Sequence, residues 1–485
     1  MSENNGGKAV KAGIGYTVGN MLIKGITFLT IPVFTRLMST EDYGIFNTFN
    51  SYMAILTIFV GLALHTSIKN AKYDFPGDLN KYTSATVLLI LINTAVIAVA
   101  ALIFSAPLSS LISYTAPLIL LMVAESLGNS LMSLYNNTLA IDFRYREYLL
   151  LSFAYSGGSV ALSVLLIKSD PFGWSSYVSR IVGSVIPLGL IAVYILIRSF
   201  ASARPTSCPK YWKYGLAISL PLIPHGLSQI LLNQCDRIMI KEMVGDSEAG
   251  IYSLAYNIAT LFFVLITSAD TAWTPWFYER MSKGDEKGIK KNTAAYTLLM
   301  SAVCILIFIG GPFLVITMGG KSYEQSRYLI IPVIYAMYYS FLYTMPVAVE
   351  YYNKKTKLIA SATVASAVLN VALNYVFIKM FGYVAAAYTT VFCHMVYFLF
   401  HLAISRKIAG KWVFNMKIMA GSTAAVTAAG VLCLVFLDGI LKFWQTVFFT
   451  PAIIIPLCAV ILLLLAVAIV RRKKIMGFIM SKIGK

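Results

Sequence analysis

The sequence predicts an all-α integral membrane protein with 14 transmembrane helices, and three observations carry this prediction. Of the 485 residues, 58% are hydrophobic and only 12% are charged, about half the charged share of an ordinary soluble domain. Fourteen apolar stretches are long enough to cross a bilayer core, which takes about 20 residues. The basic residues, which bring the net charge to +19, cluster in the segments between these stretches. That is the pattern of membrane loops, so we expect no nucleic-acid partner.

The spans and their flanking charges predict the topology. With the N-terminus inside, 29 Lys and Arg residues fall on the inner side and 8 on the outer side. This bias predicts a multi-pass protein with both termini in the cytoplasm. The start of the chain has no signal-peptide layout, so we expect its first apolar stretch to be kept as a helix. The predicted spans are 13–34, 44–66, 83–105, 113–135, 148–168, 175–197, 214–236, 250–272, 294–318, 327–350, 358–378, 384–405, 418–437 and 446–470.

Two pairs of similar segments indicate an internal repeat. EDYGIFN begins at position 41 and SEAGIYS at 247, and each opens the span after a long one. PFGWSSYVS (171–179) and MFGYVAAAY (380–388) open the sixth span of each half, at nearly the same offset. An even number of spans per repeat predicts two bundles of the same orientation, related by a pseudo-twofold axis along the membrane normal. The predicted parts are a six-helix bundle (1–205), a second six-helix bundle (206–410), and two additional helices with a basic cytoplasmic tail (411–485).

Cations within the spans are candidate substrate-binding residues, because charge in hydrocarbon is costly. Lys24 lies in the middle of the first span, where snorkelling to the surface is difficult. We expect it to face a water-filled cavity and bind an anion; the alternative is a structural pair with Glu125. Arg36 and Arg180 lie near outer ends, where they bind substrate or simply reach the interface.

The seventh span contains a histidine between helix breakers. Pro221 and Pro224 remove backbone donors and interrupt the helix, which predicts a hinge or a cavity wall at this point. His225 lies beside them and is either a phosphate-binding and titrating group or a packing histidine. Asp236 and Arg237 end the span, as a substrate or ion site or as a local interface pair.

Oxygen-bearing side chains of later spans are predicted to lie, like Asp236, in the outer half of the membrane. Asn370 and Asn374 are four apart and so lie on one helical face, and Thr390 follows in the next span. These four residues form a hard-cation ligand set; the alternative is hydrogen bonding between helices.

The loops indicate that the chain is not an enzyme. The sequence has no Walker A loop, GxSxG or HExxH motif, and no Cys/His cluster with metal-ligand spacing. The longest polar loop is predicted at 273–293, which is too short for a catalytic domain. Asp270 and Glu350, near inner ends of spans, are expected to pair with loop lysines.

Three segments resemble those of polysaccharide flippases, in the same span order. They are KGITFLTIPVFTRLMSTEDYGIFNTF (24–49), NQCDRIMIKEMVGDSEAGIYSLAY (233–256) and LNVALNYVFIKMFGYVAAAYTTV (369–391). The chain is similar to lipid-linked oligosaccharide flippases of the O-antigen and teichuronic-acid type. These belong to the superfamily that also holds the lipid II flippase and the multidrug and toxin extruders.

The resemblance implies two bundles around a central cavity that opens alternately to each side of a bacterial cytoplasmic (inner) membrane. It implies an undecaprenyl-pyrophosphate-linked oligosaccharide as substrate, with membrane lipids and a glycan polymerase complex as partners. It implies no cofactor other than a coupling ion, Na⁺ or H⁺. By motif, Asp236, Asn370, Asn374 and Thr390 match a sodium site of the lipid II branch, although that branch can have a carboxylate at the position of Asn374. A cation antiporter of the extruder type is the alternative function.

Overall fold

The computed structural model describes residues 15–449 except 17–18, 20–21 and 206, and all regular structure in these residues is helical. The chain divides into two units, 1–430 and 431–485. The helices are α2 (Ile31–Leu37), α3 (Thr40–Gly61), η1 (Leu64–Ser67), α4 (Ile68–Asp74), α5 (Leu79–Ile103), α6 (Ser105–Ile112), α7 (Ala116–Ile141), α8 (Tyr145–Ser169), α9 (Ser176–Ser202), α10 (Pro209–Ser219), η2 (Leu220–Leu222), α11 (Ile223–Met243), α12 (Asp246–Ser282), α13 (Glu286–Gly319), η3 (Lys321–Tyr323), α14 (Ser326–Tyr352), α15 (Thr356–Phe381), α16 (Ala385–Ala409), α17 (Met416–Val435) and α18 (Leu437–Phe449).

Twelve spans in the described part of the chain are long and apolar enough to cross a membrane, which confirms a multi-pass helical membrane protein. They coincide in order with the second to the thirteenth predicted spans. Of the fourteenth, 446–470, all but the first residues lie outside the described residues. The first, 13–34, is described only in part: residues 22–29 are helical and the helix is interrupted at Thr30, before α2. Pro32 explains the break, because it has no N–H to donate to the preceding turn.

The polar segment 273–293 is not a long loop. α12 continues to Ser282 and α13 begins at Glu286, so three residues connect two helices that are longer than a bilayer requires. Asp285 caps α13, because its Oδ1 accepts the N–H of Gly288 at 2.9 Å. Hydropathy marked only the apolar part of these helices, and it therefore placed the end of α12 too early and the beginning of α13 too late.

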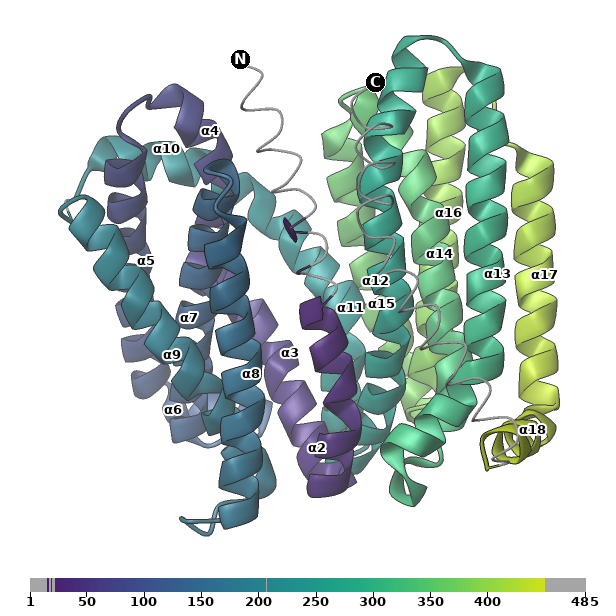
Figure 1. Cartoon of the computed structure of the whole chain (residues 1–485), viewed down its shortest axis with the longest axis horizontal. Helices are drawn as coiled ribbons and strands as arrows, with labels where there is room; N and C mark the ends of the chain where they lie inside the picture. Colours follow the sequence, from purple (N-terminus) through teal and green to yellow (C-terminus); the bar gives the residue numbers. More distant parts are fainter. Residues whose placement is uncertain (1–14, 17–18, 20–21, 206, 450–485) are drawn as a thin grey trace, which may run out of the picture. The chain divides into compact units, whose positions relative to one another are not determined.

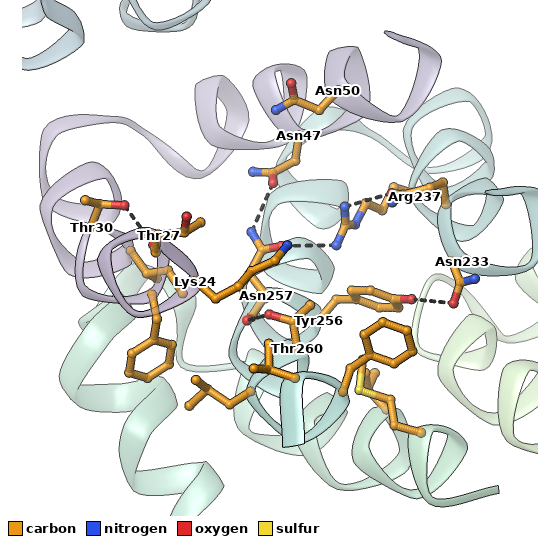
Figure 2. Close-up of a pocket in the computed structure, with 18 of the residues that line it drawn as sticks. Lys24, Thr27, Thr30, Asn47, Asn50, Asn233, Arg237, Tyr256, Asn257 and Thr260 are labelled. Atoms are coloured by element: carbon orange, nitrogen blue, oxygen red, sulfur yellow. Dashed lines mark hydrogen bonds between the residues drawn. The ribbon is translucent and has the colours of Figure 1, made fainter. Parts of the chain in front are cut away.

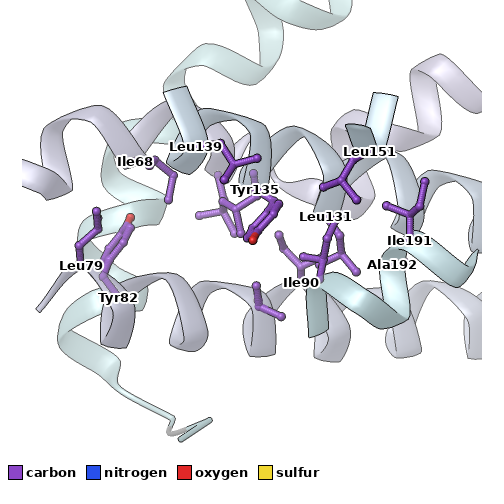
Figure 3. Packing of buried hydrophobic residues seen from close by; sticks show 14 of the residues in the cluster. Ile68, Leu79, Tyr82, Ile90, Leu131, Tyr135, Leu139, Leu151, Ile191 and Ala192 are labelled. Atoms are coloured by element: carbon purple, nitrogen blue, oxygen red, sulfur yellow. The ribbon is translucent and has the colours of Figure 1, made fainter. Parts of the chain in front are cut away.

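The helices from α3 to α9 form one packed group within the first unit. α7 lies at its centre and contacts α3, α5 and α9, while α8 packs along α9. Buried apolar residues hold the group together (Figure 3), among them Ile68, Tyr82, Leu131 and Ile195, each with at most 1% of its surface exposed.

The helices from α11 to α16 form the second group. α14 is its central helix, packed against α12, α13 and α16, and α15 packs against both α11 and α16. The two groups meet mainly where α3 contacts α11 and α12, and Figure 1 shows α3 and α11 between the two groups. The division of the chain at 205 and 410 remains a prediction.

The seventh predicted span is broken where the prolines predict a break. Between α10 and α11 the chain passes through η2, which contains Pro221, and Pro224 is the second residue of α11. A proline removes one backbone donor and clashes with the preceding turn, so the ladder of hydrogen bonds cannot run through this point.

The repeated motifs meet each other in space. A Cβ atom on Gly44 would lie 1.8 Å from the carbonyl oxygen of Asp246, and one on Gly250 would lie 2.0 Å from that of Thr40. The hydroxyls of Thr40 and Ser247 are 2.7 Å apart. The two contacts are equivalent, because Gly44 and Gly250 are 206 positions apart and so are Thr40 and Asp246. A twofold axis between the repeats requires such a reciprocal pair of contacts. Only glycine permits this close crossing of α3 and α12.

Candidate functional site

A cavity of about 1200 Å³ lies between the two groups of helices. Its walls come from residues 24–34 and from α3, α7, α8 and α9 on one side, and from α11, α12, α14 and α16 on the other. This volume exceeds the roughly 300–1,000 Å³ typical of small-molecule sites. Figure 2 shows that amides, hydroxyls and cations project into it from both sides.

Among the described residues, three cations line the cavity: Lys24, Arg180 and Arg237. Lys24 is exposed to the cavity and makes no hydrogen bond or ion pair with a described residue. The alternative, a structural pair with Glu125, finds no support, because no ion pair joins the two residues in the described part of the chain. Lys24 therefore has its charge available for a ligand.

Arg180 is held by the first group of helices. Its Nη1 donates to the hydroxyls of Ser159, at 3.1 Å, and Ser163, at 2.8 Å. Its guanidinium carbon lies 3.9 Å from the ring centroid of Phe34 and 4.8 Å from that of Phe46. Stacking on aromatic faces stabilises a cation without neutralising it, so Arg180 keeps its positive charge beside the cavity.

Arg237 is fixed by a hydrogen-bonded network that joins the two groups. Its guanidinium donates to Gln234 Oε1, at 3.0 Å, and to Asn257 Oδ1, at 3.1 Å. The amide of Asn257 in turn donates to Tyr43 OH, at 2.9 Å, and to Asn47 Oδ1, at 3.0 Å. Asn257 thus links α11, α12 and α3.

The sequence did not single out Asn257, although one signal for it exists. Asn47 is part of the first repeat motif, and Asn257 lies four residues beyond the second. A polar residue that follows the glycine of a repeated motif is expected to face the other repeat.

The acidic residue of the cavity is Glu125, the one carboxylate among the described residues that line it. Its side chain is buried on α7, and its Oε2 has no partner among the described residues. Because three cations and one carboxylate are among the described residues that line the cavity, the lining has a net positive charge. Such a lining attracts anions.

The four residues predicted as an ion site are brought together by α11, α15 and α16. Asn374 Nδ2 donates to Asp236 Oδ1 at 2.6 Å, and Thr390 Oγ1 donates to Asp236 Oδ2 at 2.8 Å. Asn370 Nδ2 donates to Thr390 Oγ1 at 3.2 Å. Tyr252 adds a third donor to the carboxylate, at 2.6 Å. All these side chains are buried, and Asp236 does not pair with Arg237.

The donor set fits a hard cation by its chemistry. Asp236, Asn370, Asn374 and Thr390 supply carboxylate, amide and hydroxyl oxygens, the ligands that sodium-like cations prefer. To bind one, the hydroxyl and amide donors that now point at the carboxylate have to rotate. Hydroxyls rotate readily, and the orientation of an amide is an assignment from its network. The described residues contain no group of three or more His, Cys, Asp and Glu suited to a metal ion.

Two predicted substrate residues lie away from the cavity wall. Arg36 Nη2 donates to the carbonyl of Thr317 at 3.3 Å and so joins α2 to α13. His225 is half-buried at the start of α11, with an Nδ1 that has no partner among the described residues. Neither residue is among those that line the cavity. By contrast, His394, which the sequence did not single out, lines it and hydrogen-bonds to the carbonyl of Thr390 at 3.0 Å.

Two acidic residues have partners other than the expected loop lysines. Glu350 contacts His401 at 2.7 Å, and Asp270 accepts a hydrogen bond from Thr274 at 3.2 Å. The expectation was wrong because α14 carries Glu350 towards α16, and because Asp270 bonds to a residue one turn further along its own helix, α12.

Helical spans around a large, net positive cavity define a membrane transporter. The family described as "Polysaccharide biosynthesis protein" matches residues 9–281, more than half of the chain. The chain belongs to this family.

Several known proteins are similar to this chain in sequence or in fold. The chain is 21% identical over 453 residues to a probable low-salt glycan biosynthesis flippase of Haloferax volcanii, Agl15, covering 90% of this chain and 93% of that protein. The lipid II flippase MurJ in an inward closed conformation has the same fold, with a TM-score of 0.68, 13% identity, and coverage of 95% and 100% of the two chains. A multidrug resistance transporter of the MATE family, in an inward-facing conformation, has a TM-score of 0.64 at 14% identity, covering 82% and 98%.

Proposed function

We propose that this protein is a flippase that moves an undecaprenyl-pyrophosphate-linked oligosaccharide across the bacterial cytoplasmic membrane, for cell-surface polysaccharide biosynthesis. The observation that carries the proposal is the charge of the cavity. Lys24, Arg180 and Arg237 line it against a single carboxylate among the described residues. A pyrophosphate group entering the membrane needs such cations, because an uncompensated charge in hydrocarbon is costly.

The size and polarity of the cavity also suit a glycan. Asparagines and hydroxyls line the cavity together with the cations (Figure 2), among them Asn50, Asn233 and Thr260. Amides and hydroxyls both donate and accept hydrogen bonds, as sugar hydroxyls require. The lipid tail of the substrate can stay in the bilayer while the head group passes through the cavity.

Alternating access is supported by the contact between the repeats. The crossing of Gly44 and Gly250 joins α3 and α12 one residue from Tyr43, which lines the cavity. Opening the cavity on that side requires the two groups to separate there, which is the rigid-body motion by which such transporters expose a central site. We place this contact at the outer face and both termini in the cytoplasm, from the distribution of Lys and Arg.

A coupling ion would act at Asp236. Its carboxylate draws α11 towards α15 and α16 through Asn374 and Thr390. A sodium ion held by these oxygens would favour the arrangement in which the three helices are close, and an ion shifts such an equilibrium only through its different affinities for the two states.

The rival function, a cation antiporter of the extruder type, is also compatible with the fold. A cavity that takes cationic drugs is expected to be acidic or apolar. Three cations against Glu125 argue for an anionic cargo and against this rival.

A flipping assay tests the proposal. Purified protein in liposomes with a fluorescent undecaprenyl-pyrophosphate oligosaccharide should expose the glycan to a membrane-impermeant reagent. Lys24→Ala should abolish this exposure, whereas Lys168→Ala should not, because Lys168 is an exposed residue at the end of α8 that does not line the cavity. Transport of a cationic dye without any movement of the glycan would replace the proposal by the rival.

A further inference from the structure

A glutamate and a histidine form a pair inside the second group of helices, away from the cavity. Glu350 lies near the C-terminal end of α14 and His401 lies on α16. His401 Nδ1 and Glu350 Oε1 are 2.7 Å apart, and both side chains have no exposed surface. Neither residue lines the cavity or belongs to the cluster around Asp236.

Each member of the pair keeps one polar atom without a partner. Glu350 Oε2 and His401 Nε2 are buried and make no hydrogen bond with any described residue. Aromatic rings surround the imidazole instead, with the centroids of Tyr397, Tyr343 and Phe400 at 4.6, 5.0 and 5.4 Å from its own. Buried polar atoms without partners are rare in native structures, and they call for an explanation.

The groups around the pair supply no second charge. Tyr343 and Tyr351 of α14 and Tyr397 of α16 are the titratable groups that interact with Glu350 besides His401. Tyr397 is bonded to Thr363 of α15 and to Tyr343. In the described part of the chain, no Lys, Arg or Asp side chain of α11, α12, α13 or α15 forms an ion pair with Glu350 or His401.

The charge of the pair therefore depends on protons alone. A carboxylate beside a neutral imidazole would leave one net negative charge buried without compensation, which is strongly unfavourable. An imidazolium beside a carboxylate is net neutral, and it forms a charge-assisted hydrogen bond, of which 2.7 Å is a typical length. Aromatic rings around the imidazole add stabilisation for a cation.

We propose that Glu350 and His401 form a proton-binding site, which holds one proton as an imidazolium–carboxylate pair while the site is closed. Because Nδ1–H faces Glu350, Nε2 is the atom that exchanges the proton. When the helix ends separate and water enters, the Nε2–H bond breaks, the proton passes to water, and a neutral imidazole and a carboxylate remain. Hydration then compensates the negative charge. The inference that the pair binds a proton does not depend on the proposed function. The further statement that this proton is coupled to transport rests on the proposed function.

The protonation state of His401 can be measured directly. The chain has 4 histidines, so ¹⁵N NMR of purified full-length protein labelled at histidine can resolve them, and His401→Gln assigns the signal. In the wild type, His401 should give an imidazolium signal, because its Nδ1 lies in a buried hydrogen bond with the Glu350 carboxylate. Glu350→Gln should convert it to a neutral imidazole. Glu279→Gln should leave it unchanged, because Glu279 is exposed and pairs with Lys283.

Two outcomes overturn the proposal: a neutral His401 in the wild type, or an imidazolium that persists in Glu350→Gln. If Glu350→Gln does not fold, the signal of the wild type decides by itself: an imidazolium at His401 supports the site, and a neutral imidazole contradicts it.

The transport consequence is tested separately in liposomes. Flipping by the wild type should respond to a pH gradient, and His401→Gln should lose this response. Absence of glycan flipping in the wild type would overturn the proposed function, whereas the NMR signal of His401 would still decide the proton site. Flipping by His401→Gln that still responds to the gradient would show that the pair binds no coupling proton.

Discussion

Replacing Gly44 with alanine should weaken the contact between α3 and α12. The added Cβ would lie 1.8 Å from the carbonyl oxygen of Asp246 and 2.8 Å from the amide nitrogen of Gly250. Both obstacles are backbone atoms, which cannot swing aside as the end of a flexible side chain can. Ordinary contact begins near 3.4 Å, so the two helices have to move apart by about 1.6 Å in a close-packed interior.

The expected cost is that of overpacking, about 1–3 kcal/mol. Alanine also raises the helix propensity of α3 by up to about 1 kcal/mol, but this gain is present whether the helices touch or not. The state in which α3 and α12 are in contact should therefore lose population by roughly 5- to 150-fold relative to the separated state.

Disulfide cross-linking measures this population. Thr40→Cys and Ser247→Cys replace two hydroxyls that lie 2.7 Å apart, in a background without the 6 native cysteines. Adding Gly44→Ala should slow formation of the cross-link, whereas Gly157→Ala should not, because a Cβ on Gly157 meets nothing within 4 Å. An unchanged rate with Gly44→Ala would refute the close crossing, and with it the contact between the repeats.

Three further predictions concern cargo charge, the ion site and topology. Lys24→Arg should retain part of the glycan export that Lys24→Ala loses, since both cations can pair with a phosphate; normal export by Lys24→Ala would make Lys24 structural. Asp236→Asn should reduce any sodium-dependent rise in melting temperature and slow export with folding intact, because it removes the only charge from the oxygen set; a wild type without such a rise would remove the sodium site. Cysteines introduced at 205–213 and 281–291 should be labelled from the cytoplasm and those at 319–325 from outside, and internal labelling of 319–325 would contradict the topology.

The spans were predictable because a bilayer imposes a simple requirement. Each membrane helix needs about 20 apolar residues whatever its neighbours are, so hydropathy alone finds it. The helix ends were less predictable, as α12 and α13 show, because a helix can continue into water without an apolar sequence. The prolines at 221 and 224 also acted locally, through one missing donor each, and so the break before α11 could be read from the sequence.

The partners of the polar residues were only partly predictable. Asn370 and Asn374 share a helical face by their spacing, and resemblance to known flippases placed them with Asp236 and Thr390. The pairing of Glu350 with His401 has no such signal. It depends on the rotation of α14 and α16 about their axes, and the residues are 51 apart in the chain. A lysine in a nearby loop was an equally reasonable partner.

The sequence by itself determined the membrane class, the order of the spans, the repeat and the presence of costly charges within the bilayer, because these follow from composition and local spacing. Only the tertiary structure decided which charges share a cavity. Lys24, Arg180 and Arg237 come from three helices far apart in the chain, and Asn257 joins both groups. Arg36 and His225, equally polar, face elsewhere. The direction of a side chain depends on how helices pack, and this packing is set by long-range contacts such as the glycine crossing, which no local pattern specifies.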